Sequence, residues 1–298
     1  MLKDRVLTSL VALPLLVALF YFDARLGQRA ALYSTFILVL TGFAAAELVA
    51  MLRNVAPRIQ RFDVVATSVL MVAAGHRVLM FREAAPDERV SPAFACLAVA
   101  TTFAIGVLLM AVADLNRYER GSVSRDEILP TFAAKLLATA YVGGGLALGS
   151  QLRWEPDGYR WLAIVLVSVK TADIGAYFVG RIVGGPHPLQ RLSPGKTLSG
   201  FIGGLVTGAA AGAGLGGVLF EDDVFDNFAW GAVVCLIFAS LGIIGDLVES
   251  LLKRGCGVKD SGSSLPGFGG LLDLIDSPLF ATAAFVLVSM TVSMISNY

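Results

Sequence analysis

The feature that most limits the fold of this chain is a series of apolar runs, each about as long as a membrane is thick. About 20 apolar residues in a helix cross the hydrocarbon core of a bilayer. The runs are roughly Val6–Phe22, Ala30–Leu52, Val64–Leu79, Ala93–Ala113, Ile128–Ser150, Trp161–Gly180, Leu198–Phe220, Phe228–Leu247 and Pro278–Ser296. Because a backbone in lipid must satisfy its own hydrogen bonds, they predict an all-α polytopic membrane protein with about nine transmembrane helices.

Composition supports this interpretation. Charged residues make up 15% of the 298 residues and hydrophobic residues 56%, whereas ordinary globular domains contain roughly 25% charged residues. A soluble protein of this size could not bury so much apolar surface. The 23 Lys and Arg balance the 23 Asp and Glu, so no basic field for nucleic acid is expected. The expected surroundings are a lipid bilayer.

The distribution of basic residues predicts the orientation. With the N-terminus inside, 14 Lys and Arg fall in inner segments and 7 in outer ones. Inner loops of membrane proteins are enriched in these residues. We therefore expect the polar segments around residues 184–196 and 249–277 to be cytoplasmic, and the acidic loop Glu221–Asn227 to lie outside. A bacterial inner membrane is the expected location.

Polar residues divide the chain into two regions. Residues 1–160 read as membrane helices with few charges inside them, Glu47 and Lys135 among these. Residues 161–298 contain a long polar segment, 246–277, beside apolar runs. Because ionisable groups within a membrane are costly, they usually mark a polar cavity or a functional site. We therefore expect the functional site in the C-terminal region.

Carboxylates in the polar segment have the spacing of a metal site. If the helix continues past Leu247, Asp246, Glu249 and Lys253 share one face. Asp273 and Asp276 share a face if their own stretch is helical. We expect Asp246, Asp273 and Asp276 to bind Mg²⁺ or another divalent cation together with substrate phosphates. The alternative from the residues alone is a solvated loop whose charges anchor helix ends.

Basic and small residues nearby are suited to phosphate groups. The expected binding groups are of two kinds, cationic side chains and loops whose backbone amides can approach an anion. The cations are Lys196, Lys253, Arg254 and Lys259, and the weaker candidates are Ser193, Thr197, Gly267, Gly269 and Gly270. Ser193, Lys196 and Thr197 precede an apolar helix, where a helix N-terminus favours phosphate. An ordinary turn with a helix cap is the alternative for that segment.

Three stretches resemble motifs of the phosphatidate cytidylyltransferases, also called CDP-diacylglycerol synthases, and they follow one another in the expected order. They begin at Asp173, Ser193 and Gly245, and the last of them runs through Leu265-Pro266-Gly267 to Asp273-Leu274-Ile275-Asp276-Ser277. The resemblance covers roughly residues 170–277. It departs from the family pattern, which usually has Lys, Glu, His and Arg, at Gly195, Ser199, Phe268 and Leu274.

The resemblance implies a nucleotidyltransferase that converts CTP and phosphatidic acid to CDP-diacylglycerol and pyrophosphate in phospholipid synthesis. In this scheme Lys253, Arg254 and Lys259 are catalytic, Asp246, Asp273 and Asp276 hold Mg²⁺, and the remaining candidates bind substrate. A homodimer is left open. Three alternatives also stay open: a related CTP-dependent enzyme with another lipid acceptor, a membrane transporter and a catalytically silent scaffold.

Overall fold

The computed structural model describes residues 18–23, 25, 31–84, 93–220, 225–262, 264 and 269–296. Within these ranges eight helices are long and apolar enough to cross a membrane. They coincide with the second to ninth expected spans, so this part of the prediction is confirmed. The first expected span, 6–22, lies mostly outside the described residues, as do residues 221–224 of the acidic loop.

The chain divides into two packing units, each made of separate stretches of sequence. The first unit contains residues 1–151, 255–274 and 289–298, and the second contains residues 152–254 and 275–288. This division concerns packing, whereas the expected division at residue 160 concerned the distribution of charge. The long helix near the C-terminus belongs in part to each unit.

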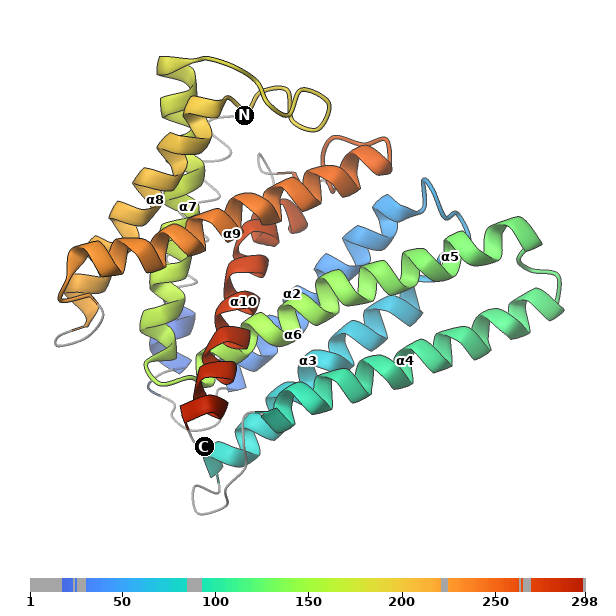
Figure 1. The fold of residues 1–298 in the computed structure, drawn as a ribbon. Coiled ribbons are helices and arrows are strands. Elements are labelled where there is room, and N and C mark those ends of the chain that lie inside the picture. The colour runs from blue at the N-terminus through green and yellow to red at the C-terminus, as the bar shows by residue number, and fades with distance from the viewer. Residues whose placement is uncertain are drawn as a thin grey trace. The chain divides into compact units, whose positions relative to one another are not determined.

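Helices packed side by side form the first unit (Figure 1). Their bounds are α2 Ala31–Leu52, α3 Arg61–Ala84, α4 Ala93–Glu119, α5 Arg125–Ala138, η1 Thr139–Gly144 and α6 Gly145–Gly149; the short helix η2 Ser150–Trp154 belongs in part to each unit. Helix α3 packs against α2, α4 and the π-helical turn η1. Its core is apolar, as Leu48 of α2 and Val64 and Val72 of α3 are fully buried. The unit thus buries one face of each helix.

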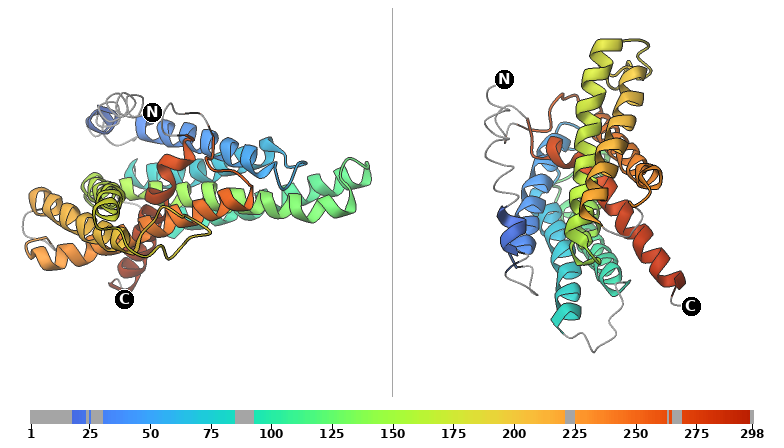
Figure 2. Two further views of the ribbon diagram at one scale, coloured as in Figure 1. Left: turned by 90° about the horizontal axis from the view of Figure 1, so that it is seen from above. Right: turned by 90° about the vertical axis from the view of Figure 1, so that its left-hand side faces the viewer.

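Four helices account for most of the second unit. They are α7 Gly158–Val183, α8 Leu198–Leu219, α9 Phe228–Gly255 and the middle part of α10, which spans Leu272–Ser296. Helices α7 and α8 run antiparallel and lie side by side in each view (Figures 1 and 2). Glycines of α8, including Gly204 and Gly208, are buried in this contact.

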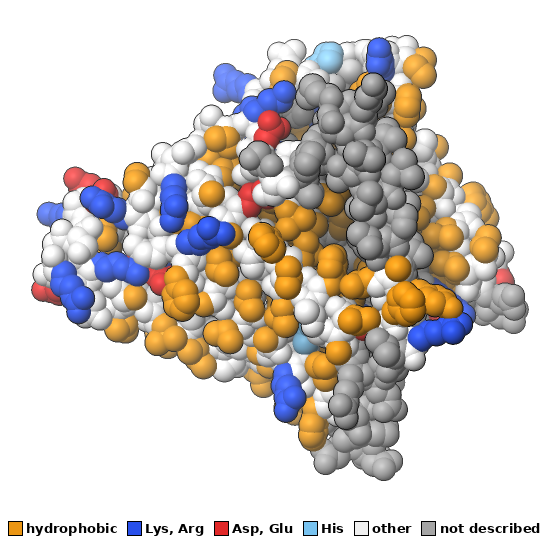
Figure 3. Space-filling model, turned by 180° about the vertical axis from the view of Figure 1, so that it is seen from behind, with side chains coloured by type: hydrophobic (Ala, Val, Ile, Leu, Met, Phe, Trp, Pro, Cys, Tyr) orange, Lys and Arg blue, Asp and Glu red, His pale blue; other side chains and the backbone are white. Residues whose placement is uncertain are grey.

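Large apolar side chains remain exposed on several helices, as expected for a protein surrounded by lipid. On α4, Leu108 and Leu109 are about two-thirds exposed, at 66% and 65%. Figure 3 shows one face of the molecule on which hydrophobic side chains cover broad areas while Lys and Arg gather in a few places. Water does not favour such a surface, but lipid tails do. The protein is an all-α integral membrane protein.

Candidate functional site

Helix α9 carries its acidic residues beyond the apolar part of the helix. The helix continues to Gly255, so the expected shared face of Asp246, Glu249 and Lys253 is confirmed. Lys253 and Arg254 lie in the last turn, where positive charge is favourable because the helix dipole is negative there. The end of α9 thus presents carboxylates and cations within three turns.

Helix α10 begins at Leu272, so the stretch that carries Asp273 and Asp276 is also helical. Helix α9 approaches the first part of α10 closely at Gly245. A methyl group at Gly245 would lie 2.5 Å from the backbone oxygen of Asp276, which is closer than real side chains allow. Glycine at this position therefore permits Asp246, the next residue, to lie near Asp276.

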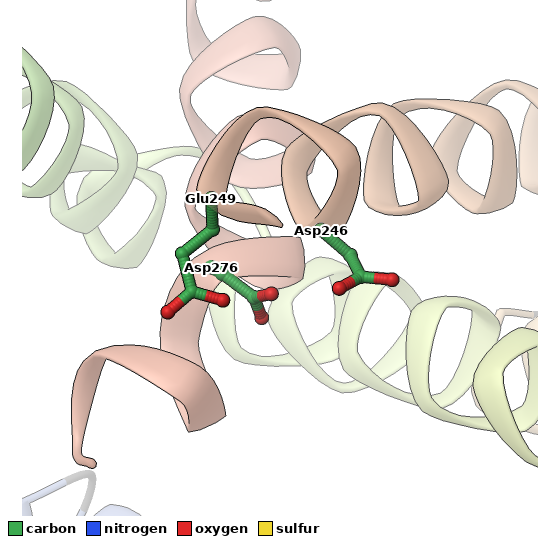
Figure 4. A group of neighbouring side chains, drawn as sticks. All are labelled: Asp246, Glu249 and Asp276. Carbon is green, nitrogen blue, oxygen red and sulfur yellow. The ribbon is translucent and has the colours of Figure 1, made fainter. Parts of the chain in front are cut away.

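Three carboxylates meet at this contact. Asp246, Glu249 and Asp276 each place one oxygen within 4.8 Å of the others, and we call them the carboxylate group. Figure 4 shows the three side chains on one side of α9 and α10. Glu249 is 0% exposed and Asp276 is 3% exposed, whereas the Asp246 side chain is 28% exposed. One edge of the group is therefore open and the rest is enclosed.

Two lysines contact the carboxylate group. Lys196 forms an ion pair with Asp246, and the Lys253 ammonium lies 2.8 Å from Glu249 Oε2. Asp276 Oδ1 instead accepts hydrogen bonds from its neighbour Ser277, from the backbone N–H at 2.6 Å and the hydroxyl at 3.1 Å. When all are ionised, three carboxylates are paired with two ammonium groups. A divalent cation suits this set, because hard oxygen ligands with excess negative charge are what Mg²⁺ prefers.

The loop before α8 holds Lys196 in place. Thr197 is the N-cap residue of α8, and its hydroxyl accepts a hydrogen bond from the Gly200 N–H at 3.0 Å. The Ser193 carbonyl accepts from the Lys196 N–H at 3.2 Å. Thr197 and Ser193 thus fix the backbone on either side of Lys196. The cap also uses one of the first-turn amides of α8 that were expected to bind phosphate.

The remaining cations have different surroundings. The Arg254 Nε–H donates to the Leu192 carbonyl at 3.2 Å, which ties the end of α9 to the same loop. Lys259 is exposed and belongs to the first unit. Gly267 and Phe268 lie outside the described residues. The assignment of Lys259 and Gly267 to the site stays a prediction.

A second acidic arrangement lies in the first unit, around the loop 261–272. Asp273 Oδ2 accepts three hydrogen bonds, from the Ser261 N–H at 3.1 Å, the Ser261 hydroxyl at 2.9 Å and the Gly270 N–H at 2.7 Å. Gly269 adopts a φ of 94° between these donors. Asp273 is therefore engaged in closing the loop. Its expected role as a metal ligand stays a prediction.

Two residues that the metal prediction omitted stand out. Glu249 completes the carboxylate group, and its place on the Asp246 face was the available signal. Glu47 of α2 accepts hydrogen bonds from the loop 261–272. Its position in an apolar run showed only that it was unusual, because spacing cannot reveal a partner more than 200 residues away.

Comparison with known proteins identifies relatives. The model of the Cytidylyltransferase family matches residues 3–292. The phosphatidate cytidylyltransferase of Brucella suis is 44% identical over 134 residues, 45% of this chain and 48% of that protein. Proteins of the same name from Staphylococcus haemolyticus and Mycobacterium bovis are 40% and 32% identical over 145 and 173 residues, covering 49% and 57% of this chain and 54% and 55% of theirs. The chain thus spans about half the length of the curated relatives it matches.

The fold and the site define an integral membrane protein of helices in which carboxylates and amines gather where two helices meet. Such a site is suited to a charged, phosphate-containing ligand rather than to an apolar one. The match over nearly the whole chain then settles the family: the chain belongs to the Cytidylyltransferase family.

Proposed function

We propose that this protein transfers the cytidylyl group of CTP to phosphatidic acid, forming CDP-diacylglycerol and pyrophosphate. The carboxylate group with Lys196 and Lys253 is the observation that carries the proposal. The names of the bacterial relatives support the choice of substrates. In the reaction, a phosphatidate oxygen attacks the α-phosphorus of CTP, and the bond from that phosphorus to the pyrophosphate oxygen breaks.

The residues present suit this chemistry. The phosphatidate phosphate is already ionised, so the reaction requires no strong general base. The main obstacle is repulsion between anions, which cations can reduce in a partly enclosed site. We assign Lys196, Lys253 and Arg254 to phosphate oxygens. Lys196 and Lys253 now neutralise carboxylates, so they exchange these partners for substrate phosphates when CTP binds.

We propose that Asp246, Glu249 and Asp276 hold a divalent cation, Mg²⁺ being the expected one. Such an ion, when bound, supplies positive charge to the phosphates and stabilises the leaving pyrophosphate. In this proposal the third metal ligand is Glu249, whereas the sequence predicted Asp273. We assign Ser193 and Thr197 to positioning Lys196 rather than to binding substrate, because both hold the backbone around Lys196.

We further propose that the carboxylate group opens to the cytoplasm of a bacterial cell. The bias of Lys and Arg supports this orientation, and the relatives are bacterial. CTP would then arrive from water while the lipid headgroup enters from the inner leaflet. Whether the protein forms a homodimer stays a prediction.

The test uses the full chain purified in detergent. It is incubated with labelled CTP, phosphatidic acid and Mg²⁺, and the lipids are then extracted. Label is expected in the lipid fraction with Mg²⁺ and is expected to be lost with a chelator. Label that requires another lipid phosphate in place of phosphatidic acid would overturn the substrate assignment. Equal label in chelator would overturn the metal assignment.

A further inference from the structure

Glu47 is a buried acidic residue of the first unit, on the mostly apolar helix α2. It lies in α2 one and a half turns before the end of the helix at Leu52 and is 8% exposed. An ionised carboxylate in such a place is costly unless several donors hydrogen-bond to it. Its partners therefore indicate why the chain contains a carboxylate here.

Among the described residues, three groups donate hydrogen bonds to Glu47, and all three lie in the loop 261–272 or at its end. Oε1 accepts from the Ser264 hydroxyl at 2.7 Å, and Oε2 accepts from the Ser261 hydroxyl at 3.4 Å. Oε2 also accepts from the Leu272 N–H at 2.8 Å. Both oxygens are thus occupied by one loop, and the two ends of that loop are joined through one side chain.

The third partner places Glu47 at the beginning of a helix. Leu272 is the first residue of α10, and the first N–H groups of a helix have no partner within it. The positive end of the helix dipole lies there as well, which favours an anion. Glu47 therefore acts as a cap for α10 that comes from another helix rather than from the preceding residue.

The loop is shaped to admit this carboxylate. A methyl group at Gly270 would lie 2.6 Å from Glu47 Oε2, so only glycine permits the close approach. Asp273 closes the same loop from its other side through Ser261 and Gly270. Ser261 contacts both carboxylates and is itself buried. The loop is thus held between Glu47 and Asp273.

We propose that Glu47 is a positioning residue that holds Ser261, Ser264 and the first turn of α10 in the arrangement required to bind the nucleotide. This inference rests on the proposed function, because Gly269 and Gly270, which lie beside these contacts, are candidates for binding the phosphates of CTP. Glu47 itself is not assigned to touch substrate. It acts through the loop, and α10 carries Asp276 four residues beyond the capped end.

The first experiment does not depend on activity. Hydrogen exchange of the full chain in detergent is compared for wild type, Glu47→Gln and Thr41→Val. Glutamine removes the charge of Glu47 and keeps only one of its two acceptor oxygens, and charge-assisted hydrogen bonds are the stronger kind, so exchange across 261–274 should rise by about tenfold or more. Thr41 lies on the same helix, and its hydroxyl donates to the Ile37 carbonyl of that helix. Thr41→Val should leave the loop unchanged.

The second experiment measures CTP and phosphatidate kinetics. Glu47→Gln should raise the KM for CTP by about tenfold. The kcat and the KM for phosphatidate should stay within about threefold of wild type, because the contacts of Glu47 are proposed to support the binding of CTP alone. Glu47→Asp keeps both acceptor oxygens and should restore much of the loss. A general loss of structure would instead lower kcat through a smaller active fraction and leave the KM for CTP unchanged.

A further variant keeps the inference testable if Glu47→Gln fails to fold. Ser264→Ala removes one donor from the exposed side of the loop and should raise loop exchange and the KM for CTP in the same direction by a smaller factor. Unchanged exchange of 261–274 in both variants would overturn the inference. So would raised exchange with an unchanged KM for CTP. An inactive wild type would instead overturn the proposed function and the nucleotide role, while exchange would still report the link from Glu47 to the loop.

Discussion

Two groups of charged side chains lie in the membrane-spanning helices, and they differ in charge balance. In the first unit, a balanced network joins two carboxylates, Asp63 and Asp114, to two cations, Arg117 and Lys135. Lys135 Nζ lies 2.8 Å and 2.6 Å from the two carboxylates, and Arg117 Nη1 lies 3.1 Å and 2.8 Å from them. In the second unit, the three residues of the carboxylate group form ion pairs, within the described residues, with two cations, Lys196 and Lys253.

The difference shows what an ionisable residue in a membrane helix means. Opposite charges in the balanced network neutralise one another, and they join α3, α4 and α5. When its three carboxylates are ionised, the carboxylate group has one more charge than Lys196 and Lys253 balance, and it has one open edge. Charge within the membrane therefore does not by itself mark a functional site. A functional site is indicated by charge that lacks an opposite partner and that a ligand can reach.

The balanced network should matter most for stability. Lys135 is 0% exposed, and Lys135→Met would leave the buried Asp114 and the partly buried Asp63 with Arg117 alone. Breaking a buried pair in this way costs about 3–5 kcal/mol. We expect a corresponding fall in the free energy of unfolding, measured by chemical denaturation in detergent. Arg160→Met removes an exposed pair with Asp157 and should cost less than about 1 kcal/mol. Equal losses would remove the distinction between buried and exposed pairs.

The carboxylate group should matter most for catalysis. Asp246→Asn and Asp276→Asn should each reduce the rate of cytidylyl transfer at least about a hundredfold, because several kcal/mol of transition-state stabilisation depend on the metal. The folded yield should remain close to that of wild type. Asp63→Asn, in the balanced network, should leave the turnover of the folded fraction within about threefold. Near-normal turnover in either site variant would mean that the metal lies elsewhere.

A metal titration distinguishes the two acidic arrangements around α10. Glu249→Gln should raise the Mg²⁺ concentration for half-maximal activity by about tenfold, as loss of a ligand weakens metal binding. Asp273→Asn should shift that concentration by less than about threefold, because its hydrogen bonds close a loop. The reverse order would restore Asp273 to the metal site.

Thiol labelling shows to which side of the membrane the carboxylate group opens. An impermeant reagent should label Asp226→Cys on intact cells, in a chain without other cysteines. It should label Lys259→Cys only after permeabilisation. The opposite pattern would reverse the proposed orientation.

Native Cys256 is a poorer probe of the same side. It is 6% exposed, and burial raises the pKa of its thiol. The thiolate is the reactive form, and a raised pKa lowers its fraction at any pH near or below that value. Lys259→Cys should therefore react on the order of fivefold faster at neutral pH. The labelling rate of Cys256 should continue to rise with pH in the alkaline range, after the labelling rate of the exposed thiol has reached its plateau. Equal rates would contradict the burial of Cys256.

The smallest effect is expected where the chain departs from the family pattern beside Lys196. A Cβ atom at Gly195 would meet nothing within 4 Å, so Gly195→Lys should leave the thermal midpoint nearly unchanged. One added exposed cation contributes up to about 1 kcal/mol, so the KM for CTP should fall by up to about fivefold. A rise in this KM would show that the carboxylate group gains nothing from further positive charge.

Features that follow from the periodicity of the sequence, namely the membrane helices and the residues that share a helix face, could be predicted. Runs of apolar residues located the membrane helices, and the spacing of Asp246, Glu249 and Lys253 predicted a shared face that α9 confirms. The same spacing rule placed Asp273 with Asp276, since both lie on α10. It could not show that the Ser261 and Gly270 amides compete for the Asp273 oxygen, because this depends on how the loop folds back.

The contacts of Glu47 also set a time interval during protein synthesis. Its partners Ser264 and Leu272 follow it by 217 and 225 residues. At roughly 5–20 residues per second, a ribosome requires on the order of 10–45 s to reach them. Throughout that interval Glu47 has been synthesised, while the donors that hydrogen-bond to its carboxylate have not. A nascent chain stalled before residue 261 therefore carries, in a membrane helix, an acidic residue that still lacks these hydrogen-bond partners.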